Sequence, residues 1–398
     1  AIAEYIKTKI DGRPLKILTI EEAIHNDNTR MDPHTSSGTP WKFWYPKKGK
    51  TGLFIFDEDG QVSFLNEHFR QECEIWLAAL KEGKVPPMAT YLFSKAELRA
   101  IEKLFKTRTI DVVPATCSVV FRQIHQSLID KMIAQGDGTK QWCFGINPCS
   151  MDWRQLAQSL MATNPEAPLC FDLDVSNWDG HMNVQLLTAV AEVFNYLYED
   201  EYQQARLAMV LQMVSAPTQF GPYVFKKFRG MSSGWPGTTV FNTIGHMILS
   251  YLVWRKMCRT IGRVDLLPFQ AFHSLVTVRL YGDDNITSVD PSIFYFYNAV
   301  TVAKHYSLFG FPATSGDKVS SHIPHRPLSE VTFLKRNIVV DKTGHIVLAP
   351  LKLAVIYDMV REIRTSKRET VQTQFKSNYY DACRELLQHS GEEYGYFV

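Results

Sequence analysis

The chain has 398 residues, of which 45% are hydrophobic and 12% aromatic, and its formal net charge at pH 7 is +2. This length exceeds one ordinary hydrophobic core and suits two or three subdomains, while the small net charge gives no strong signal for nucleic acid. The seven cysteines are odd in number and never spaced as C-x-x-C, which argues against a disulfide framework and a zinc site and indicates a reducing compartment.

The first hundred residues are mixed and punctuated by glycine, proline and aromatic residues, without an internal repeat. No apolar run approaches the ~18–20 residues that span a bilayer, and the amino end lacks the apolar core of a signal peptide. We therefore expect a soluble, cytosolic protein without an integral membrane segment.

The middle of the chain alternates strand and helix patterns. An apolar run at 168–174 predicts a buried strand, and apolar residues at helical spacing predict helices at about 183–198 and 201–214. A hairpin-like stretch at 223–228 then leads through a glycine-rich loop into a long helix at about 237–259.

The next segment predicts a hairpin with two adjacent carboxylates at its tip. Strand-forming residues at 275–281 and 286–289 flank Gly282, which permits a tight turn, so Asp283 and Asp284 lie at the turn. A helix at 292–306 follows, and a second hairpin joins 331–340 to 346–348.

This order of elements resembles a split β-α-β layout, an α+β fold in which helices pack on one face of an antiparallel sheet. Such a sheet can bring the strand end at Asp174 beside Asp283. Two carboxylates ~5 Å apart would repel each other by about 3 kcal/mol at an effective dielectric of ~20, a cost that bound divalent cations would offset. Oxygen ligands with room for water and phosphate suit Mg²⁺, and two such ions would support nucleotidyl transfer.

Each of these features also has an ordinary structural interpretation. Asp174 and Asp179 are typical of turns or caps, and the loop at 230–239, which could grip sugar and phosphate, is also ordinary N-terminal capping. Asp172 shares a strand face with Asp174 and could be a third ligand or the first one, but only Asp174 gives a four-residue gap to Asp179.

Two further patterns carry no chemistry in our interpretation. Gly49-Lys50-Thr51 mimics the end of a P-loop but lacks its earlier glycine, so we expect a solvated basic turn. His322 and His325 have no accompanying cysteine or carboxylate set, so we interpret them as loop residues.

Taken together, the motifs resemble an RNA-dependent RNA polymerase of the positive-strand RNA viruses, within the picornavirus-like group. The family pattern D-x-x-x-x-D is matched by Asp174 and Asp179, and S-G-x-x-x-T-x-x-x-N by Ser233, Gly234, Thr238 and Asn242. Tyr281-Gly282-Asp283-Asp284 matches Y-G-D-D, Lys318 matches a loop lysine, and Phe333-Leu334-Lys335-Arg336 matches F-L-K-R. Upstream, Lys95, Arg99, Lys103, Lys106 and Arg108 resemble a basic finger motif, and Thr35-Ser36-Ser37-Gly38-Thr39-Pro40 a template-entry motif.

The resemblance implies a role for each matching residue. The catalytic and metal-binding set is Asp174, Asp283 and, as an auxiliary, Asp284, with two Mg²⁺ or Mn²⁺ ions, and Lys318 would protonate the leaving pyrophosphate. The nucleotide-binding set is Asp179, Ser233, Gly234, Thr238 and Asn242 near the ribose 2′-hydroxyl, and Lys106 and Arg108 at the triphosphate. The RNA-binding set is Ser36, Ser37, Gly38, Lys95, Arg99, Lys335 and Arg336. For Lys95, Arg99 and Lys103, a solvated helix face is an equal alternative.

The implied architecture is a right hand with an antiparallel-sheet palm backed by helices. We expect fingers at 1–124 and 188–234, palm at 125–187 and 235–339, and thumb at 340–398, with both ends short for the family. The expected function is template-directed RNA synthesis from NTPs on an RNA template and primer, in replication complexes in the host cytoplasm, with a genome-linked protein primer and other viral proteins as further partners.

Two other classes of protein stay open at this point. A reverse transcriptase shares the palm but expects a bulky aromatic residue where Asp179 stands, and it would use dNTPs. A catalytically silent RNA-binding or scaffold protein would retain its function when Asp283 is replaced.

Overall fold

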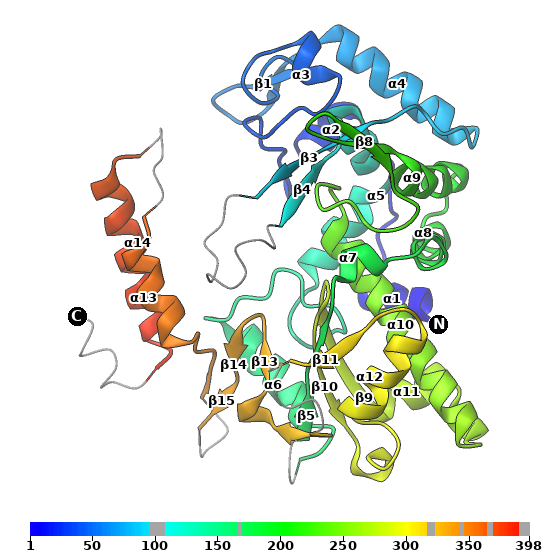
Figure 1. The fold of residues 1–398 in the computed structure, drawn as a ribbon, viewed down its shortest axis with the longest axis vertical. Coiled ribbons are helices and arrows are strands. Elements are labelled where there is room, and N and C mark those ends of the chain that lie inside the picture. Colours follow the sequence, from blue (N-terminus) through cyan, green and yellow to red (C-terminus); the bar gives the residue numbers. More distant parts are fainter. Residues whose placement is uncertain (96–107, 166–168, 317–322, 342–345, 364–368, 390–398) are drawn as a thin grey trace. The chain divides into compact units, whose positions relative to one another are not determined.

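A computed structural model describes residues 1–95, 108–165, 169–316, 323–341, 346–363 and 369–389 (Figure 1). The chain forms two compact units, one from Ala1–Gln135 and Asn177–Ser250 and the other from Gly136–Ser176 and Tyr251–Val398. The expected division into fingers, palm and thumb stays a prediction. In the part of the chain that the structure describes, no helix is both long and apolar enough to cross a membrane.

The first unit is mainly helical. Its helices are α1 (Ile2–Lys9), α2 (Ile20–Ile24), α3 (Trp41–Trp44), α4 (Glu67–Lys81), α5 (Ala115–Ala134), α7 (Trp178–His181), α8 (Val184–Leu197), α9 (Gln203–Ser215) and the first half of α10 (Thr238–Thr260). Helix α5 is buried along most of its length and packs against α2, α4 and α9, and several of its polar side chains have hydrogen-bond partners: Arg122 donates to the Ala23 carbonyl at 2.8 Å.

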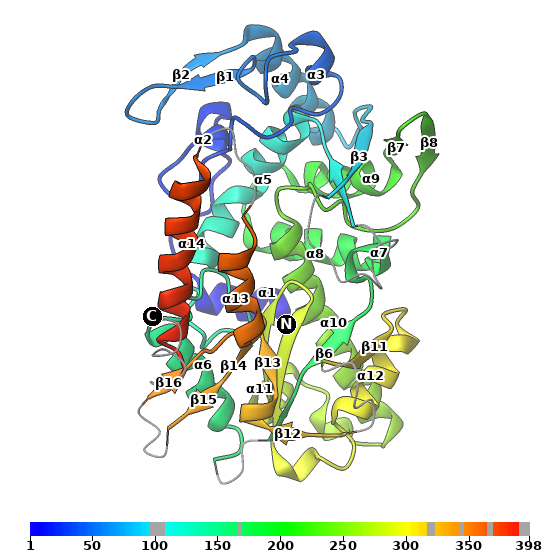
Figure 2. The same ribbon diagram turned by 60° about the vertical axis from the view of Figure 1, so that its left-hand side comes forward.

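Two small sheets complete this unit. One is the hairpin of β1 (Phe54–Phe56) and β2 (Val62–Leu65). The other has the order β4-β3-β7-β8, built from β3 (Thr90–Ser94), β4 (Thr109–Val112), β7 (Pro217–Phe220) and β8 (Tyr223–Lys226) (Figure 2). Only the β3–β7 pairing in this sheet is parallel. β4 and β8 are the two edge strands of this sheet, and the segment after β8 reaches β4 through the ion pair of Lys227 with Asp111.

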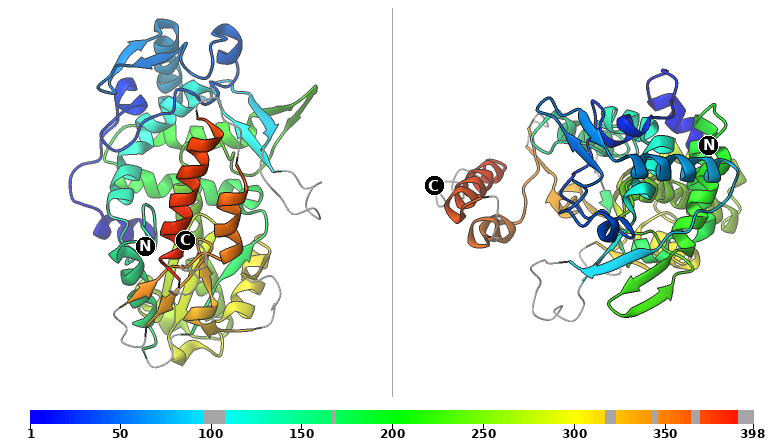
Figure 3. Two further views of the ribbon diagram at one scale, coloured as in Figure 1. Left: turned by 90° about the vertical axis from the view of Figure 1, so that its left-hand side faces the viewer. Right: turned by 90° about the horizontal axis from the view of Figure 1, so that it is seen from above.

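The second unit contains an antiparallel sheet of order β12-β5-β10-β9. Its strands are β5 (Leu169–Phe171), β9 (Val276–Tyr281), β10 (Asp284–Val289) and β12 (Arg326–Pro327). Short pairs join β6 (Leu173–Val175) to β11 (Ala313–Ser315), β13 (Thr332–Phe333) to β14 (Arg336–Asn337), and β15 (Val339–Val340) to β16 (Val347–Leu348). Its helices are α6 (Met151–Met161), α11 (Phe269–Leu275), α12 (Ala299–Leu308), α13 (Leu353–Arg361) and α14 (Val371–Leu386), the last two side by side (Figure 3).

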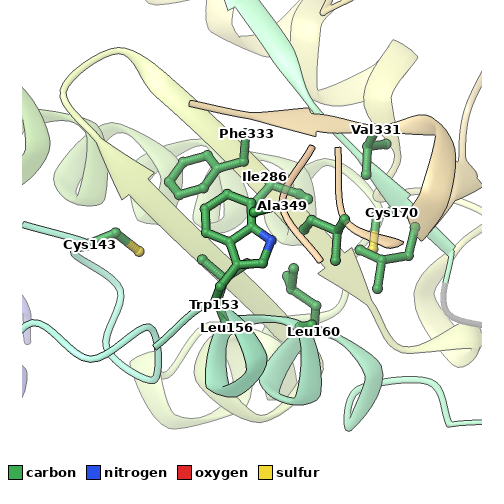
Figure 4. Close-up of a cluster of buried hydrophobic side chains, with 12 residues drawn as sticks. Cys143, Trp153, Leu156, Leu160, Cys170, Ile286, Val331, Phe333 and Ala349 are labelled. Carbon is green, nitrogen blue, oxygen red and sulfur yellow. The ribbon is translucent and has the colours of Figure 1, made fainter. Parts of the chain in front are cut away.

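A hydrophobic cluster supports the sheet of the second unit from one side. In Figure 4, Trp153 of α6 faces Phe333 of β13 and Ile286 of β10, and the Trp153 and Phe333 rings stack with centroids 6.4 Å apart. Because Ile286 is fully buried, the cluster fixes strand β10 two residues after Asp284. The rest of the cluster comes from Cys143, Leu156, Ala157, Leu160, Cys170, Leu328, Val331, Ile338 and Ala349.

Most of the predicted elements are confirmed, and four need correction. The hairpin-like stretch predicted at 223–228 is a single strand, β8, whose hairpin partner is β7. The strand predicted at 168–174 breaks at Asp172 into β5 and β6, which pair with different strands. The helix predicted at 292–306 begins only at Ala299, because Pro291 starts a separate 3₁₀ turn and Asn298 caps α12. The strand predicted at 331–340 folds back at Leu334 and Lys335, which have positive φ angles of 53° and 64°.

Candidate active site

The acidic hairpin forms as predicted. Asp284 pairs with Tyr281 across the turn, and Gly282 adopts a φ of 65°, a conformation that favours glycine. The Leu280 amide donates to the Gln141 carbonyl at 2.8 Å, and the Cys143 amide donates to the Leu280 carbonyl at 2.9 Å. One edge of the hairpin is therefore held by segment 141–143 and the other by β5, so that only its tip is left to project.

Asn285 joins this hairpin to the strand that carries Asp174. Its side-chain Oδ1 accepts from the Leu173 amide at 3.1 Å, and its Nδ2 donates to the Leu173 carbonyl at 2.8 Å and to the Asp283 carbonyl at 3.2 Å. The Asn285 side chain is only 3% exposed, so these bonds are shielded from water. The side chain thus fills the place of a missing ladder bond between β6 and β10 and brings the residue before Asp174 together with Asp283.

Asp284 points toward another motif. Its Oδ2 accepts from the Leu334 amide at 2.9 Å, in the tight turn of the F-L-K-R segment. Burial raises the pKa of this carboxyl to about 6, and the nearby Asp283 and Asp172 carboxylates add to the shift. With one oxygen engaged by the backbone, Asp284 has less capacity to bind a metal than the predicted auxiliary role assumes, and that role stays a prediction.

The question of Asp172 is resolved by its partners. Its Oδ1 accepts from Arg326 Nη2 at 2.8 Å, while its Oδ2 accepts from the Thr332 hydroxyl at 3.2 Å. Arg326 also donates to the Ser315 hydroxyl at 2.7 Å. A Cβ added at Gly316 would lie 2.1 Å from Asp172 Oδ2. Asp172 is thus a buried, paired carboxylate at the junction of β5 and β6, with both oxygens occupied, and not an open metal ligand.

The residues predicted to sense the ribose belong to the first unit. Asn242 Nδ2 donates to Asp179 Oδ1 at 2.6 Å, and the Met231 amide donates to the Asp179 carbonyl at 2.8 Å. The other amide atom of Asn242, Oδ1, is buried and has no hydrogen-bond partner among the described residues. The structure therefore brings Asp179 and Asn242 together as predicted and leaves one acceptor of the pair unused.

The glycine-rich loop is held by its own hydroxyls and by β4. The Thr238 hydroxyl donates to the carbonyls of Ser232 at 3.0 Å and Trp235 at 2.7 Å, and Ser233 Oγ accepts from the Asp111 amide at 3.1 Å. A Cβ added at Gly234 would lie 2.1 Å from the Asp111 carbonyl oxygen, so the loop backbone lies directly on β4. The sequence alone assigned no role to Asp111, which is separated from this loop by more than a hundred residues.

The predicted RNA-binding residues have mixed surroundings. Lys95 directly follows β3 and Arg108 directly precedes β4; both are exposed, and the Lys95 amide donates to the Arg108 carbonyl at 2.8 Å. Arg336 forms a two-point ion pair with Glu385, with both N–O distances 2.7 Å, so a primer contact would compete with this carboxylate. Lys335 lies in the tight turn after Leu334. The predicted residues Arg99, Lys103, Lys106 and Lys318 lie outside the described residues.

Hydrogen bonds anchor the template-entry motif, and one of them involves Lys50, which we expected to be a solvated basic residue. The Ser37 carbonyl accepts from the Ala115 amide at 2.9 Å, and Ser36 Oγ accepts from the Gly38 amide at 3.2 Å. Lys50 is only 6% exposed and its ammonium bonds to the Thr35 hydroxyl, so it is not the solvated basic turn that we expected. Burial lowers the pKa of Lys50 to about 8.

Two carboxylates of the second unit, Asp174 and Asp283, are ligands of the kind that Mg²⁺ takes. Mg²⁺ is usually bound through one or two protein carboxylates, with water and substrate phosphate completing its octahedron. Accordingly, the described residues need not include a complete cage, and they contain no group of three or more His, Cys, Asp or Glu arranged to hold a metal. Asp174 and Asp283, linked through Leu173 and Asn285, would supply such a partial set.

A family model described as viral RNA-dependent RNA polymerase matches residues 16–398. The chain belongs to this family. The structure is similar to that of the Sicinivirus 3Dpol RNA dependent RNA polymerase, with a TM-score of 0.77 and 21% sequence identity. The match covers 100% of this chain and 78% of that one. The predicted family and the predicted α+β right-hand polymerase fold are confirmed.

Curated relatives are viral polyproteins. The chain is 27% identical over 355 residues to the genome polyprotein of Rice tungro spherical virus (strain Vt6), covering 84% of this chain and 10% of that polyprotein. It is 25% identical over 395 residues to the RNA1 polyprotein of Andean potato mottle virus, covering 98% of this chain and 52% of that polyprotein. It is 28% identical over 396 residues to the replicase polyprotein of Acute bee paralysis virus (strain Rothamsted), covering 95% of this chain and 20% of that polyprotein. The chain thus spans about half or less of the length of these relatives.

Proposed function

We propose that this chain is the polymerase part of a viral replicase and copies an RNA template into RNA from NTPs. Family membership supports the reaction class, and one structural observation supports its location. The Asn285 side chain binds β6 at Leu173 and the acidic hairpin at Asp283, so the two aspartates predicted to share metals are carried by one hydrogen-bonded cluster.

In this proposal Asp174 and Asp283 hold two Mg²⁺ or Mn²⁺ ions, with Asp284 as an auxiliary. Bound there, the ions would activate the 3′-hydroxyl of the growing strand and stabilise the leaving pyrophosphate. The protein's contribution is orientation: the Asn285 side chain bonds to the backbone of Leu173, next to Asp174, and to the Asp283 carbonyl, so little reorganisation is needed when substrate arrives. Lys318 would supply the proton to pyrophosphate, and Lys106 and Arg108 would neutralise the triphosphate.

Ribose selection is assigned to Asp179 of α7, to Thr238 and Asn242 of α10, and to Ser233 on the loop that contains Gly234. The unused Oδ1 of Asn242 is a buried acceptor suited to a ribose 2′-hydroxyl. A site with such an acceptor rejects an analogue that lacks the hydroxyl, because the acceptor would then stay unpaired. This arrangement favours NTPs over dNTPs, as expected of an RNA polymerase rather than a reverse transcriptase.

The remaining partners follow from the chemistry of replication and from the polyprotein relatives. We assign the template path to Ser36, Ser37, Gly38, Lys95 and Arg99, and the primer strand to Lys335 and Arg336. A genome-linked protein primer and other products of a viral polyprotein would be further partners, in replication complexes in the host cytoplasm.

A primer-extension assay on an RNA hairpin tests the proposal. With Mg²⁺ and NTPs we expect extension to the template end, with dNTPs much less extension at the same concentration, and without a divalent ion none. Equal use of NTPs and dNTPs would support a reverse transcriptase instead. RNA binding without any extension would support the scaffold alternative.

A further inference from the structure

Asp111 is a buried carboxylate at which several contacts of the first unit converge. It lies on β4 and is 4% exposed. Its Oδ2 forms an ion pair with Lys227 Nζ and accepts from the Ser232 hydroxyl at 2.6 Å. Lys227 Nζ also donates to Ser232 Oγ at 3.1 Å, which closes a triangle of three side chains. The other carboxylate oxygen, Oδ1, is buried and has no hydrogen-bond partner among the described residues.

The backbone of the same residue docks the next part of the loop. The Asp111 amide donates to Ser233 Oγ at 3.1 Å, and Gly234 lies so close to the Asp111 carbonyl that a Cβ there would be 2.1 Å from its oxygen. Three consecutive loop residues therefore rest on Asp111, through its carboxylate, its amide and its carbonyl in turn.

The far side of the loop is tied to the residues that we assign to the ribose. The Thr238 hydroxyl donates to the Ser232 carbonyl at 3.0 Å, and the Met231 amide donates to the Asp179 carbonyl at 2.8 Å. Asp179 in turn accepts from Asn242. A displacement of Ser232 would therefore move Thr238 directly and would change the support of the Asp179–Asn242 pair.

Stability alone does not account for this charge. Replacing a buried ion pair with apolar residues of similar size is often neutral or stabilising, whereas removing one partner leaves an uncompensated buried charge. Where such a pair is retained, its defined geometry is the feature that an apolar pair cannot reproduce. At Asp111, the geometry that the ion pair defines is the conformation of the loop that carries Ser233.

We propose that Asp111, together with Lys227, is a positioning residue that holds the Ser232–Gly234 loop in the geometry required to select ribonucleotides. This inference rests on the proposed polymerase function. It predicts that loosening the pair weakens binding of the 2′-hydroxyl without impairing the metal-dependent chemistry that both kinds of nucleotide share.

The test measures kcat and KM for single-nucleotide incorporation with an NTP and its dNTP, together with the midpoint of thermal unfolding. The variants are Asp111→Asn, Ser232→Ala and the double variant Asp111→Leu/Lys227→Met. For Asp111→Asn we expect the KM for the NTP to rise about tenfold and kcat/KM for the dNTP to change less than about twofold, as for the loss of one hydrogen bond to a substrate hydroxyl. Ser232→Ala leaves the ion pair in place. It should lower the ratio of kcat/KM for the NTP to kcat/KM for the dNTP as well, but by a smaller factor.

The double variant and a control separate positioning from folding. The double variant should recover the midpoint of thermal unfolding, because no unpaired charge stays buried, but not the preference for the NTP. The control is Asp200→Asn, which breaks the buried ion pair of Asp200 with Arg206 in the same unit, away from the loop. It should lower thermal stability and leave the NTP/dNTP ratio unchanged.

Unchanged NTP/dNTP ratios in both Asp111→Asn and Ser232→Ala would overturn this inference while leaving the polymerase function intact. So would a ratio that Asp200→Asn alters equally, since the effect would then follow stability. If the wild-type chain does not extend RNA with NTPs at all, the proposed function falls and this inference falls with it.

Discussion

At the scale of single residues, the side chains that organise this protein are not all the ones that carry its motifs. Asn285 follows the Y-G-D-D motif directly, yet its side chain bonds to Leu173, 112 positions earlier in the chain. Asp172 is an extra acid in the sequence, and only its contact with Arg326 shows that it is a structural partner. Such roles could not be predicted from the sequence, because the pattern gives the residue type but not the distant partner.

Replacing Asn285 with aspartate tests its role as a link between the two metal-binding segments. The substitution keeps the size but removes the Nδ2 donor, so a carboxylate oxygen would face the carbonyls of Leu173 and Asp283. We expect activity to fall by about 10–100-fold, as is usual for residues that orient metal ligands. The Mg²⁺ concentration for half-maximal extension should also rise.

Asn337→Asp is a suitable control for this variant, because Asn337 also donates to a backbone carbonyl, that of Ser329, outside the acidic hairpin. Direct binding of Mn²⁺, followed by its paramagnetic resonance signal, gives a second readout. Equal Mn²⁺ affinity in Asn285→Asp and wild type would contradict the role of Asn285.

His325 makes stability depend on pH. Burial lowers its pKa to about 4, its ring lies 4.1 Å from that of Phe294, and neither ring nitrogen has a hydrogen-bond partner among the described residues. Between pH 6.5 and 4 the unfolded chain binds a proton on this ring that the folded protein does not bind. The free energy of unfolding therefore falls as the pH falls through this window.

For His325→Phe we expect greater stability than wild type at pH 5.5, by at most about 1 kcal/mol because the ring is only partly buried, and a smaller difference at pH 7.5. Thermal unfolding at the two pH values measures this, with the exposed His273→Phe as a reference substitution. An equal shift at both pH values would show that packing and not protonation is responsible.

At the scale of elements, local pattern predicted the regular helices and the acidic hairpin but not where strands change partners. The apolar run before Asp174 predicts one strand, whereas the chain leaves the sheet of β10 at Asp172 and pairs with β11 instead. The hydrophobic pattern of this run is the same whether it forms one strand or two, so the pattern could not predict the break. The break depends on the buried network of Asp172, Arg326 and Thr332, which forms only in the folded protein.

Breaking this network should destabilise the second unit. Arg326→Met leaves Asp172 as an uncompensated buried charge, for which we expect a loss of about 3–5 kcal/mol of stability. Thermal unfolding should detect this as a lower midpoint, and Asp172→Asn in the same chain should restore part of the loss. Arg263→Met breaks an exposed ion pair with Asp265 and should change stability by less than about 1 kcal/mol. A loss in Arg326→Met no larger than that of Arg263→Met would contradict the structural role of Asp172.

At the scale of the whole molecule, the sequence motifs identified the family because their order and spacing match it over most of the chain. The same motifs could not predict that the chain forms two compact units, with the carboxylates assigned to metal in one and the residues assigned to the ribose in the other. Those unit boundaries follow from packing between segments far apart in the chain, which spacing alone does not encode.

The most direct test of the central claim is extension of an RNA hairpin by Asp283→Ala compared with wild type and with Asp265→Ala, which removes an exposed aspartate of the same unit. We predict that Asp283→Ala binds the RNA hairpin with wild-type affinity and fails to extend it in Mg²⁺ or Mn²⁺, while Asp265→Ala extends it normally. Extension by Asp283→Ala at the wild-type rate would contradict the assignment of this hairpin as the catalytic centre.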